Sequence, residues 1–260
     1  MSYQFFTGRG RNGEKVMLPQ AFREKLKWRP RLGDQFPHFI GSSTHGTIDF
    51  RRWAEGSWVV FFSQPGTFSS VCTTEMGMFV RDQAMFEERG IKLIALAKED
   101  LGEQLSWLRE IERLYGAPVE FPSVEDPTGM LATAFGMTTD REIAPEPARV
   151  TFILDPHRVT RMISEHPLAI GRSSDEFLRT IDALHTHTER DCYTPGGWRP
   201  GDEVIVPDDI ADDDVETRYG ESRRFNAYLR LFDPARARAG ALEGQSQGEG
   251  SSDEAQLQDD

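Results

Sequence analysis

Apolar residues along the chain gather in short continuous runs, and the stretches between these runs have helical periodicity. The runs WVVFF (58–62), KLIALA (92–97) and VTFILD (150–155) contain very few polar residues, which is typical of strands buried on both faces of a sheet. Helical spacing covers residues 72–88, a stretch around residues 105–114, and a stretch that begins at Ser173. This alternation predicts an α/β fold whose sheet carries helices on both faces.

The two ends of the chain have a different texture. FPHFIGSSTHGTIDF (36–50) predicts a leading hairpin or loop, and CYTPGGWRPGDEVIVPDD, after residue 190, is rich in Gly, Pro and acids. We interpret the latter as a small C-terminal extension with too few apolar residues for a core of its own, ending in a short helix-like stretch near residues 223–232. From about residue 235 the composition is Ala, Gly, Ser, Gln and acids, which favours disorder.

Four parts are therefore expected along the chain. They are an N-terminal extension (1–32), a main α/β domain (33–190), a C-terminal extension (191–234) and a disordered acidic tail (235–260).

Charge and cysteine usage exclude several classes of function. The formal net charge is −13 and no basic stripe is present, so we expect neither nucleic acid nor a membrane surface as a partner. The chain contains no membrane-spanning run and no secretory signal, which predicts a cytoplasmic location. Its two cysteines lie far apart in the sequence, so neither a disulfide scaffold nor a metal site is expected.

One of these cysteines lies in the stretch PGTFSSVCTTE (65–75), directly after the first apolar run. Helical periodicity begins near Cys72, which places this residue in the first turn of a helix. Unpaired amide groups and the positive end of the helix dipole favour a thiolate there. Ser69 is placed to cap the helix and to offer a hydroxyl beside the sulfur, while Pro65 stiffens the loop.

A free cysteine taken by itself is more often a small buried hydrophobe than a nucleophile. The full spacing of Pro65, Ser69, Cys72 and Glu75 after a buried strand favours the reactive alternative.

This stretch resembles the Pro-x-x-x-Thr/Ser-x-x-Cys motif of peroxiredoxins, and the sequence is most similar to the 1-Cys branch of that family. Further similar stretches, in the same order, are FPHF, GTIDF, ARVTFILDP, HPLAIGRSSDEFLRTIDAL and TPGGWRPGDEVIVP, so the resemblance covers roughly residues 33–230. It implies a thioredoxin-like fold with a central mixed sheet. It also implies reduction of hydrogen peroxide and alkyl hydroperoxides without a cofactor, re-reduction by thioredoxin, glutaredoxin or a small thiol, and a homodimer or a ring of dimers.

The resemblance assigns roles residue by residue. It implies that Cys72 is the peroxidatic cysteine that becomes sulfenic acid, that Arg149 is the active-site arginine, and that Ser69 positions the peroxide. Pro65 matches the shielding proline. A supporting pair that would hold the arginine in place corresponds to Glu75 and Arg172.

Two positions depart from the family's pattern. Gln64 stands where the 1-Cys branch usually has His, immediately before Pro65. Cys192 lies two residues before the position at which two-cysteine relatives carry their resolving cysteine, so it is either a resolving thiol out of register or an adventitious or partner-facing one.

Two alternatives to an enzyme follow from the same residues. Gln64, Cys192 and the charged tail would suit a peroxide sensor that passes oxidation to a partner and turns over little. A thioredoxin-fold binding module without redox activity is the other alternative.

Overall fold

A computed structural model of the chain describes residues 7–9, 15–17, 29–138 and 148–235. These residues fall into two compact units, which divide between Phe177 and Leu178. Nearly all of the predicted acidic tail (235–260) and most of the predicted N-terminal extension (1–32) lie outside the described residues. The boundaries of the four predicted parts stay predictions.

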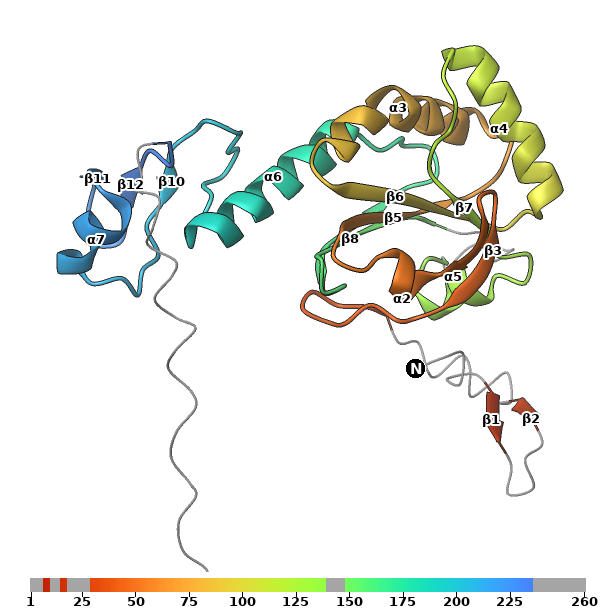
Figure 1. Cartoon of the computed structure of the whole chain (residues 1–260), viewed down its shortest axis with the longest axis horizontal. Coiled ribbons are helices and arrows are strands. Elements are labelled where there is room, and N and C mark those ends of the chain that lie inside the picture. Colours follow the sequence, from red (N-terminus) through yellow and green to blue (C-terminus); the bar gives the residue numbers. More distant parts are fainter. Residues whose placement is uncertain (1–6, 10–14, 18–28, 139–147, 236–260) are drawn as a thin grey trace, which may run out of the picture. The chain divides into compact units, whose positions relative to one another are not determined.

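The first unit is built on a sheet of seven strands. Its strands are β3 (Ile40–Ser43), β4 (Gly46–Asp49), β5 (Trp58–Gln64), β6 (Ile91–Ala97), β7 (Ser123–Glu125), β8 (Arg149–Leu154) and β9 (Thr160–His166). They lie in the order β4-β3-β7-β6-β5-β8-β9 (Figure 1). β5, β6 and β7 are parallel to one another. On one side of them β8 pairs antiparallel with β5 and with β9, and on the other side β3 pairs antiparallel with β7 and with β4. The sheet is therefore mixed, as predicted.

The three apolar runs found in the sequence form the adjacent strands β6, β5 and β8. Almost every residue of these strands is buried, including all of β8, because helices cover both faces of the sheet. The leading stretch 36–50 contains the β3–β4 hairpin. The predicted buried strands and the predicted leading hairpin are therefore both confirmed.

Helices lie on opposite faces of this sheet. They are α2 (Phe50–Trp53), α3 (Ser70–Glu87), α4 (Leu101–Tyr115), α5 (Met130–Ala134) and α6 (Ser174–Arg190), the last of which runs from the first unit into the second. α3 and α4 cover one face, and α2 and α5 cover the other (Figure 1). This arrangement confirms the predicted α/β architecture.

Aromatic side chains fill the space on both faces. On the α2 and α5 face, six phenylalanines pack together: Phe36, Phe39, Phe50, Phe61, Phe135 and Phe152. On the α3 face, Phe62 of β5 stacks on Phe79 of α3 with ring centroids 4.3 Å apart. Offset aromatic contacts at this distance add to the free energy of burial, and they fix α3 against the central strand.

α3 also packs closely against α4. A Cβ atom on Gly77 would lie 1.9 Å from Tyr115 Cζ, so only glycine permits this approach. One turn away, Trp107 of α4 donates a hydrogen bond from its indole Nε1 to Thr73 Oγ1, over 3.1 Å. The first turns of α3 are thereby held from the α4 side as well as from the sheet.

The second unit contains the short elements β10 (Val204–Ile205), α7 (Asp212–Tyr219), β11 (Ser222–Arg224) and β12 (Arg230–Phe232). The prediction of a helix near residues 223–232 is wrong, because this stretch forms an antiparallel pair of strands. Asn226 closes its turn by accepting hydrogen bonds from the amides of Tyr228 and Leu229. The helix lies instead in the acidic segment before it, where three aspartates occupy the first turn and suit the positive end of the helix dipole.

The C-terminal extension does have a small apolar core, contrary to expectation. Seven side chains form it: Cys192, Trp198, Val204, Val206, Val215, Tyr219 and Phe232. These positions are scattered singly along the sequence, so no continuous apolar run predicts a core there.

Near the N-terminus, β1 (Thr7–Arg9) and β2 (Lys15–Met17) form an antiparallel pair. None of the helices in the described part of the chain combines the length and apolarity needed to cross a bilayer.

Candidate active site

The connection from β5 to α3 carries the cysteine motif. α3 begins at Ser70, so Cys72 lies in its first turn and the sequence prediction is confirmed. Its side chain is 0% exposed. Ser69 occupies the N-cap position, but its side chain makes no capping hydrogen bond. The predicted position of Ser69 as the N-cap residue is therefore confirmed, whereas the predicted capping hydrogen bond from its side chain is wrong. The Ser69 hydroxyl is not engaged in capping the helix.

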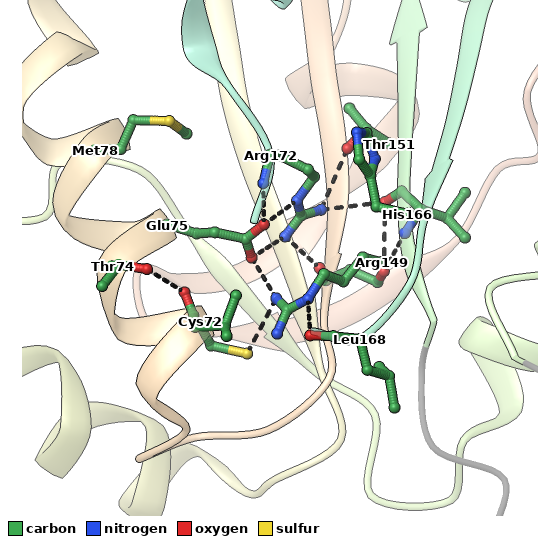
Figure 2. A network of polar contacts seen from close by, with 12 residues as sticks. Cys72, Thr74, Glu75, Met78, Arg149, Thr151, His166, Leu168 and Arg172 are labelled. Atoms are coloured by element: carbon green, nitrogen blue, oxygen red, sulfur yellow. Dashed lines mark hydrogen bonds and ion pairs between the residues drawn. The ribbon is translucent and has the colours of Figure 1, made fainter. Parts of the chain in front are cut away.

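Arg149 reaches this sulfur from the neighbouring strand. It is the first residue of β8 and is 2% exposed. Its Nη1 lies 3.5 Å from Cys72 Sγ, and its Nε donates to the carbonyl oxygen of Leu168 over 2.8 Å (Figure 2). A guanidinium held through both its Nε and its Nη1 has little freedom to turn away from the sulfur.

Glu75 lies one turn after Cys72 on the same helix and joins two arginines. Its Oε2 accepts from Arg149 Nη1 at 2.5 Å and from Arg172 Nη2 at 2.7 Å. Its Oε1 accepts from both the backbone amide and the Nε of Arg172, each at 2.8 Å (Figure 2). Each carboxylate oxygen thus accepts two hydrogen bonds, which confines the side chain to one orientation.

Arg172 extends this network into the sheet. Its guanidinium donates to the carbonyl oxygen of Ser63 at 2.9 Å and to Thr151 Oγ1 at 3.2 Å, and it lies over the Phe62 ring at 5.2 Å. The residue therefore ties together α3, β5 and β8, which are the elements that carry or surround Cys72.

The charges of this network do not cancel. Burial raises the pKa of the Glu75 carboxyl, but the hydrogen bonds and charge of Arg172, together with the charge of Arg149, lower it overall below its ordinary value. Glu75 is therefore a carboxylate at neutral pH. One carboxylate between two guanidinium groups leaves one positive charge uncompensated. Cys72 Sγ lies against Arg149, which makes fewer hydrogen bonds to the Glu75 carboxylate than Arg172 does.

Gln64 is the last residue of β5 and precedes Pro65, which is half-buried. The Gln64 side chain is 0% exposed, and neither its Nε2 nor its Oε1 has a hydrogen-bond partner among the described residues. Leaving such atoms unpaired costs about 1–3 kcal/mol each. An uncharged amide thus occupies the place where the 1-Cys branch usually has an imidazole.

Cys192 has none of the surroundings of Cys72. It is 0% exposed within the small core of the second unit, and its Sγ donates to the carbonyl oxygen of Thr186 at 3.6 Å. Burial and then the charge of Asp191 raise the pKa of its thiol to about 11. The two cysteines are free in the structure and form no disulfide.

Metal ligands do not gather anywhere in the described ranges, where no group of three His, Cys, Asp or Glu side chains could hold an ion. His187, which follows His185 near the end of α6, instead has its Nδ1 2.8 Å from the carbonyl oxygen of Cys192.

Three contributors to the site were missed in the sequence. The carbonyl oxygens of Ser63 and Leu168 and the hydroxyl of Thr151 each bond one of the two arginines. Main-chain acceptors leave no trace in residue type, and the residue type of Thr151 does not indicate its partner, so only the fold could reveal these contacts.

Comparison with known proteins supports the same interpretation. The model of the AhpC/TSA family matches residues 32–163, and that of the C-terminal domain of 1-Cys peroxiredoxin matches residues 183–222. The chain belongs to the peroxiredoxin family. This peroxiredoxin is accordingly a thiol-dependent peroxidase, and its thioredoxin-like fold and 1-Cys resemblance are confirmed.

Relatives of this peroxiredoxin match most of its length. A mitochondrial peroxiredoxin of Saccharomyces cerevisiae is 31% identical over 222 residues, which are 83% of this chain and 85% of the relative. The solved structure of a yeast mitochondrial 1-Cys peroxiredoxin has a TM-score of 0.75 at 31% identity, covering 78% of this chain and 99% of that one. Peroxiredoxin 6 of Arenicola marina has a TM-score of 0.76 at 30% identity, covering 80% and 99%.

Proposed function

We propose that Cys72 is the residue that reduces the hydroperoxide and that Arg149 is its electrostatic partner. The observation that supports this proposal is the 3.5 Å approach of Arg149 Nη1 to Cys72 Sγ at the first turn of α3. A thiolate at Cys72 neutralises the positive charge that Glu75 leaves uncompensated. The helix start adds backbone dipoles that favour the same charge.

The reaction then follows from the chemistry of a thiolate. Its sulfur attacks one peroxide oxygen in line, so a sulfur–oxygen bond forms as the oxygen–oxygen bond breaks. The other oxygen leaves as hydroxide or alkoxide and takes up a proton to become water or alcohol. Cys72 is left as sulfenic acid.

Two further residues support this step. The Ser69 hydroxyl, free of a capping bond, can donate to the peroxide oxygen that is becoming negative, and so can Nη2 of Arg149, which takes no part in the contacts described above. Pro65 has no amide hydrogen and restricts the loop that precedes the helix. Glu75 and Arg172 act indirectly, because they hold Arg149 in position.

Re-reduction requires a thiol from another molecule. Cys192 is buried and its thiol pKa is raised to about 11, which argues against a resolving role. We propose thioredoxin, glutaredoxin or a small thiol as the reductant. The structure of the yeast mitochondrial 1-Cys peroxiredoxin is described with a thiol-resolving mechanism via glutathione and thioredoxin systems, which supports the proposal. A homodimer or ring of dimers and a cytoplasmic location stay predictions.

The decisive experiment follows the fate of both sulfurs. Reduced protein is mixed anaerobically with one equivalent of hydrogen peroxide, the sulfenic acid is trapped with a dimedone reagent, and peptides are mapped by mass spectrometry. We expect the adduct on Cys72 and none on Cys192. Adducts on Cys192 first, or on neither cysteine while peroxide disappears, would contradict the assignment.

Turnover distinguishes the enzyme from a sensor. With thioredoxin and its reductase present, we expect consumption of many equivalents of peroxide per chain. A single equivalent consumed with each of the three reductants would favour the sensor.

A further inference from the structure

One face of α3 holds the chain segment 171–174, which leads into α6. The side chains that contact this segment recur at the spacing of a single helix face: they are Val71, Glu75, Met78 and Asp82. Gly171 lies against the first of them, because a Cβ atom on it would be 3.6 Å from Val71 Cγ1. The backbone amide of Arg172 donates to Glu75 Oε1 at 2.8 Å. The segment therefore runs along α3 and is held by it.

The sulfur of Met78 is one of the acceptors in this row. It accepts a hydrogen bond from the backbone amide of Ser174, the first residue of α6, over 3.1 Å. The Ser174 hydroxyl donates to Asp82 Oδ2. Figure 2 shows Met78 on the same side of α3 as Glu75. A thioether is a weak acceptor, yet here it serves a residue that is 4% exposed, at a helix start whose amides have no partner within the helix.

The thioether is also the acceptor in this row that peroxide can change. Met78 is half-buried, whereas the nearby Met76 is 0% exposed. A thioether sulfur attacks one oxygen of a hydroperoxide, so a sulfur–oxygen bond forms as the oxygen–oxygen bond breaks. The proton of the attacked oxygen passes to the other oxygen, which leaves as water or alcohol. The oxidant is the hydroperoxide that the enzyme already reduces.

A sulfoxide at Met78 is incompatible with the present contact. An oxygen added on the side of the amide would have to lie between nitrogen and sulfur, and their separation of 3.1 Å leaves no room for another atom. An oxygen added on the other side polarises the sulfur positively and removes it as an acceptor. In either case the Ser174 amide must move.

Movement of Ser174 affects the network at Cys72. Arg172, two residues earlier, donates three of the four hydrogen bonds that the Glu75 carboxylate accepts. The fourth comes from Arg149, whose Nη1 lies 3.5 Å from Cys72 Sγ. Displacing segment 171–174 therefore loosens the carboxylate that orients Arg149.

We propose that Met78 is a second oxidation site of this peroxiredoxin, and that its conversion to the sulfoxide slows the reaction of Cys72 with peroxide. Cys72 reacts first, because a thiolate is the better nucleophile. Lasting excess of peroxide then oxidises Met78 and lowers the activity. Met78 is a positioning residue, since it acts through Arg172 and Glu75. This inference rests on the role proposed for Cys72.

Formation of the sulfoxide is tested in Cys72→Ser, which lacks the sulfur that we propose as the nucleophile. The variant is treated with excess hydrogen peroxide, and tandem mass spectrometry of its peptides locates each sulfoxide. We expect oxidation of Met78 and of Met85, which is 42% exposed, but not of Met76. A Met78 as resistant as Met76 would overturn the inference.

The effect on Cys72 is measured in the wild type and in two leucine variants of α3. Each protein is treated with excess hydrogen peroxide and reduced with dithiothreitol, and stopped flow gives the rate of oxidation per remaining Cys72 thiol before and after treatment. In the wild type we expect the rate to fall about 3- to 10-fold, in line with one lost hydrogen bond. Met85→Leu is the matched control and should show the same fall. Met78→Leu has no sulfur to oxidise at this position, so its rate should be the same before and after.

Repair of the sulfoxide separates this effect from general damage. Methionine sulfoxide reductases reverse the modification. Once mass spectrometry shows that Met78 is a thioether again, the wild-type rate should return. A low rate that persists after repair, a rate that never falls in the wild type, or an equal fall in Met78→Leu would overturn the inference.

Failure of the Cys72 assignment has a different signature. Cys72→Ser would then consume peroxide at the wild-type rate, whereas the location of the sulfoxide is read in that variant whatever its activity.

Discussion

The two cysteines of this chain are equally inaccessible to solvent, yet their surroundings differ in every respect that governs sulfur chemistry. Cys72 lies at a helix start, with a guanidinium 3.5 Å from its sulfur and an excess positive charge behind it. Cys192 lies among apolar side chains, and burial, followed by the charge of Asp191, raises the pKa of its thiol to about 11. Exposure therefore does not separate the cysteine that we propose as the nucleophile from the one that we propose as inert, whereas the charge around each sulfur does.

The largest expected effect separates the two sulfurs directly. Cys72→Ser should reduce peroxide consumption to the background of the buffer, because a serine hydroxyl is not ionised at neutral pH. Cys192→Ser is the matched control and should consume peroxide at the wild-type rate. Stopped-flow peroxide assays with reductant in excess measure both. Consumption that survives in the first variant, or is lost in the second, would reverse the comparison.

Arg149→Met removes the charge while keeping much of the side chain's volume. We expect a loss of about 10²–10³-fold in the rate of Cys72 oxidation, the size found when one stabilising donor is removed from an active site. Glu75 keeps Arg172 as its partner, so the fold should persist, which thermal unfolding followed by circular dichroism checks. Arg149→Lys should recover only part of the rate, since an ammonium cannot contact Leu168, Glu75 and the sulfur together. An unchanged rate in the methionine variant would show that the guanidinium is structural.

Glu75→Gln should cost stability, because it leaves two buried guanidinium groups without a counter-charge. We expect a loss of about 3–5 kcal/mol in the free energy of unfolding, measured by urea titration. Exposed Glu110→Gln should stay within about 0.5 kcal/mol of the wild type. A loss no larger than that of the control would mean that the network is not under electrostatic constraint.

The same carboxylate predicts a pH dependence. The folded-state pKa of Glu75 is below its ordinary value of 4.5, so its stabilising contribution is fully present above about pH 4.5. It is lost as the pH falls from there through the folded-state pKa. Urea titrations across this range should show a steeper loss in the wild type than in Glu75→Gln, and parallel curves would contradict this.

The smallest effect concerns the labelling of Cys192 in a Cys72→Ser background. A pKa raised from 9.0 to about 11 reduces the thiolate fraction near pH 8 by about 10²-fold. We therefore expect a thiol reagent to label Cys192 slowly in the native protein and quickly in denaturant. Equal rates would show that the second unit opens readily.

Local sequence was enough to predict the elements that carry the chemistry. The strands β5, β6 and β8 are continuous apolar runs, and Cys72 follows the first of them at the onset of helical periodicity. Arg149 is different, because its contact with a residue 77 positions earlier depends on β8 lying beside β5. Nothing in its local sequence distinguishes it from an arginine at a strand edge, so resemblance to a family was needed to single it out.

The remaining features could not be inferred for physical reasons. The second unit has short strands and a core of isolated apolar positions, too sparse for periodicity to register. Gln64 stood out as a substitution, but its unpaired amide could be recognised only in three dimensions.

The hydrogen bond from Trp107 to Thr73 places an indole next to the residue that follows the reactive sulfur. Indole emission responds to nearby charge and to loss of a hydrogen bond, so we expect the emission of Trp107, one of five tryptophans in the chain, to change if Cys72 is oxidised. Such a change would report on the first turns of α3 without a label.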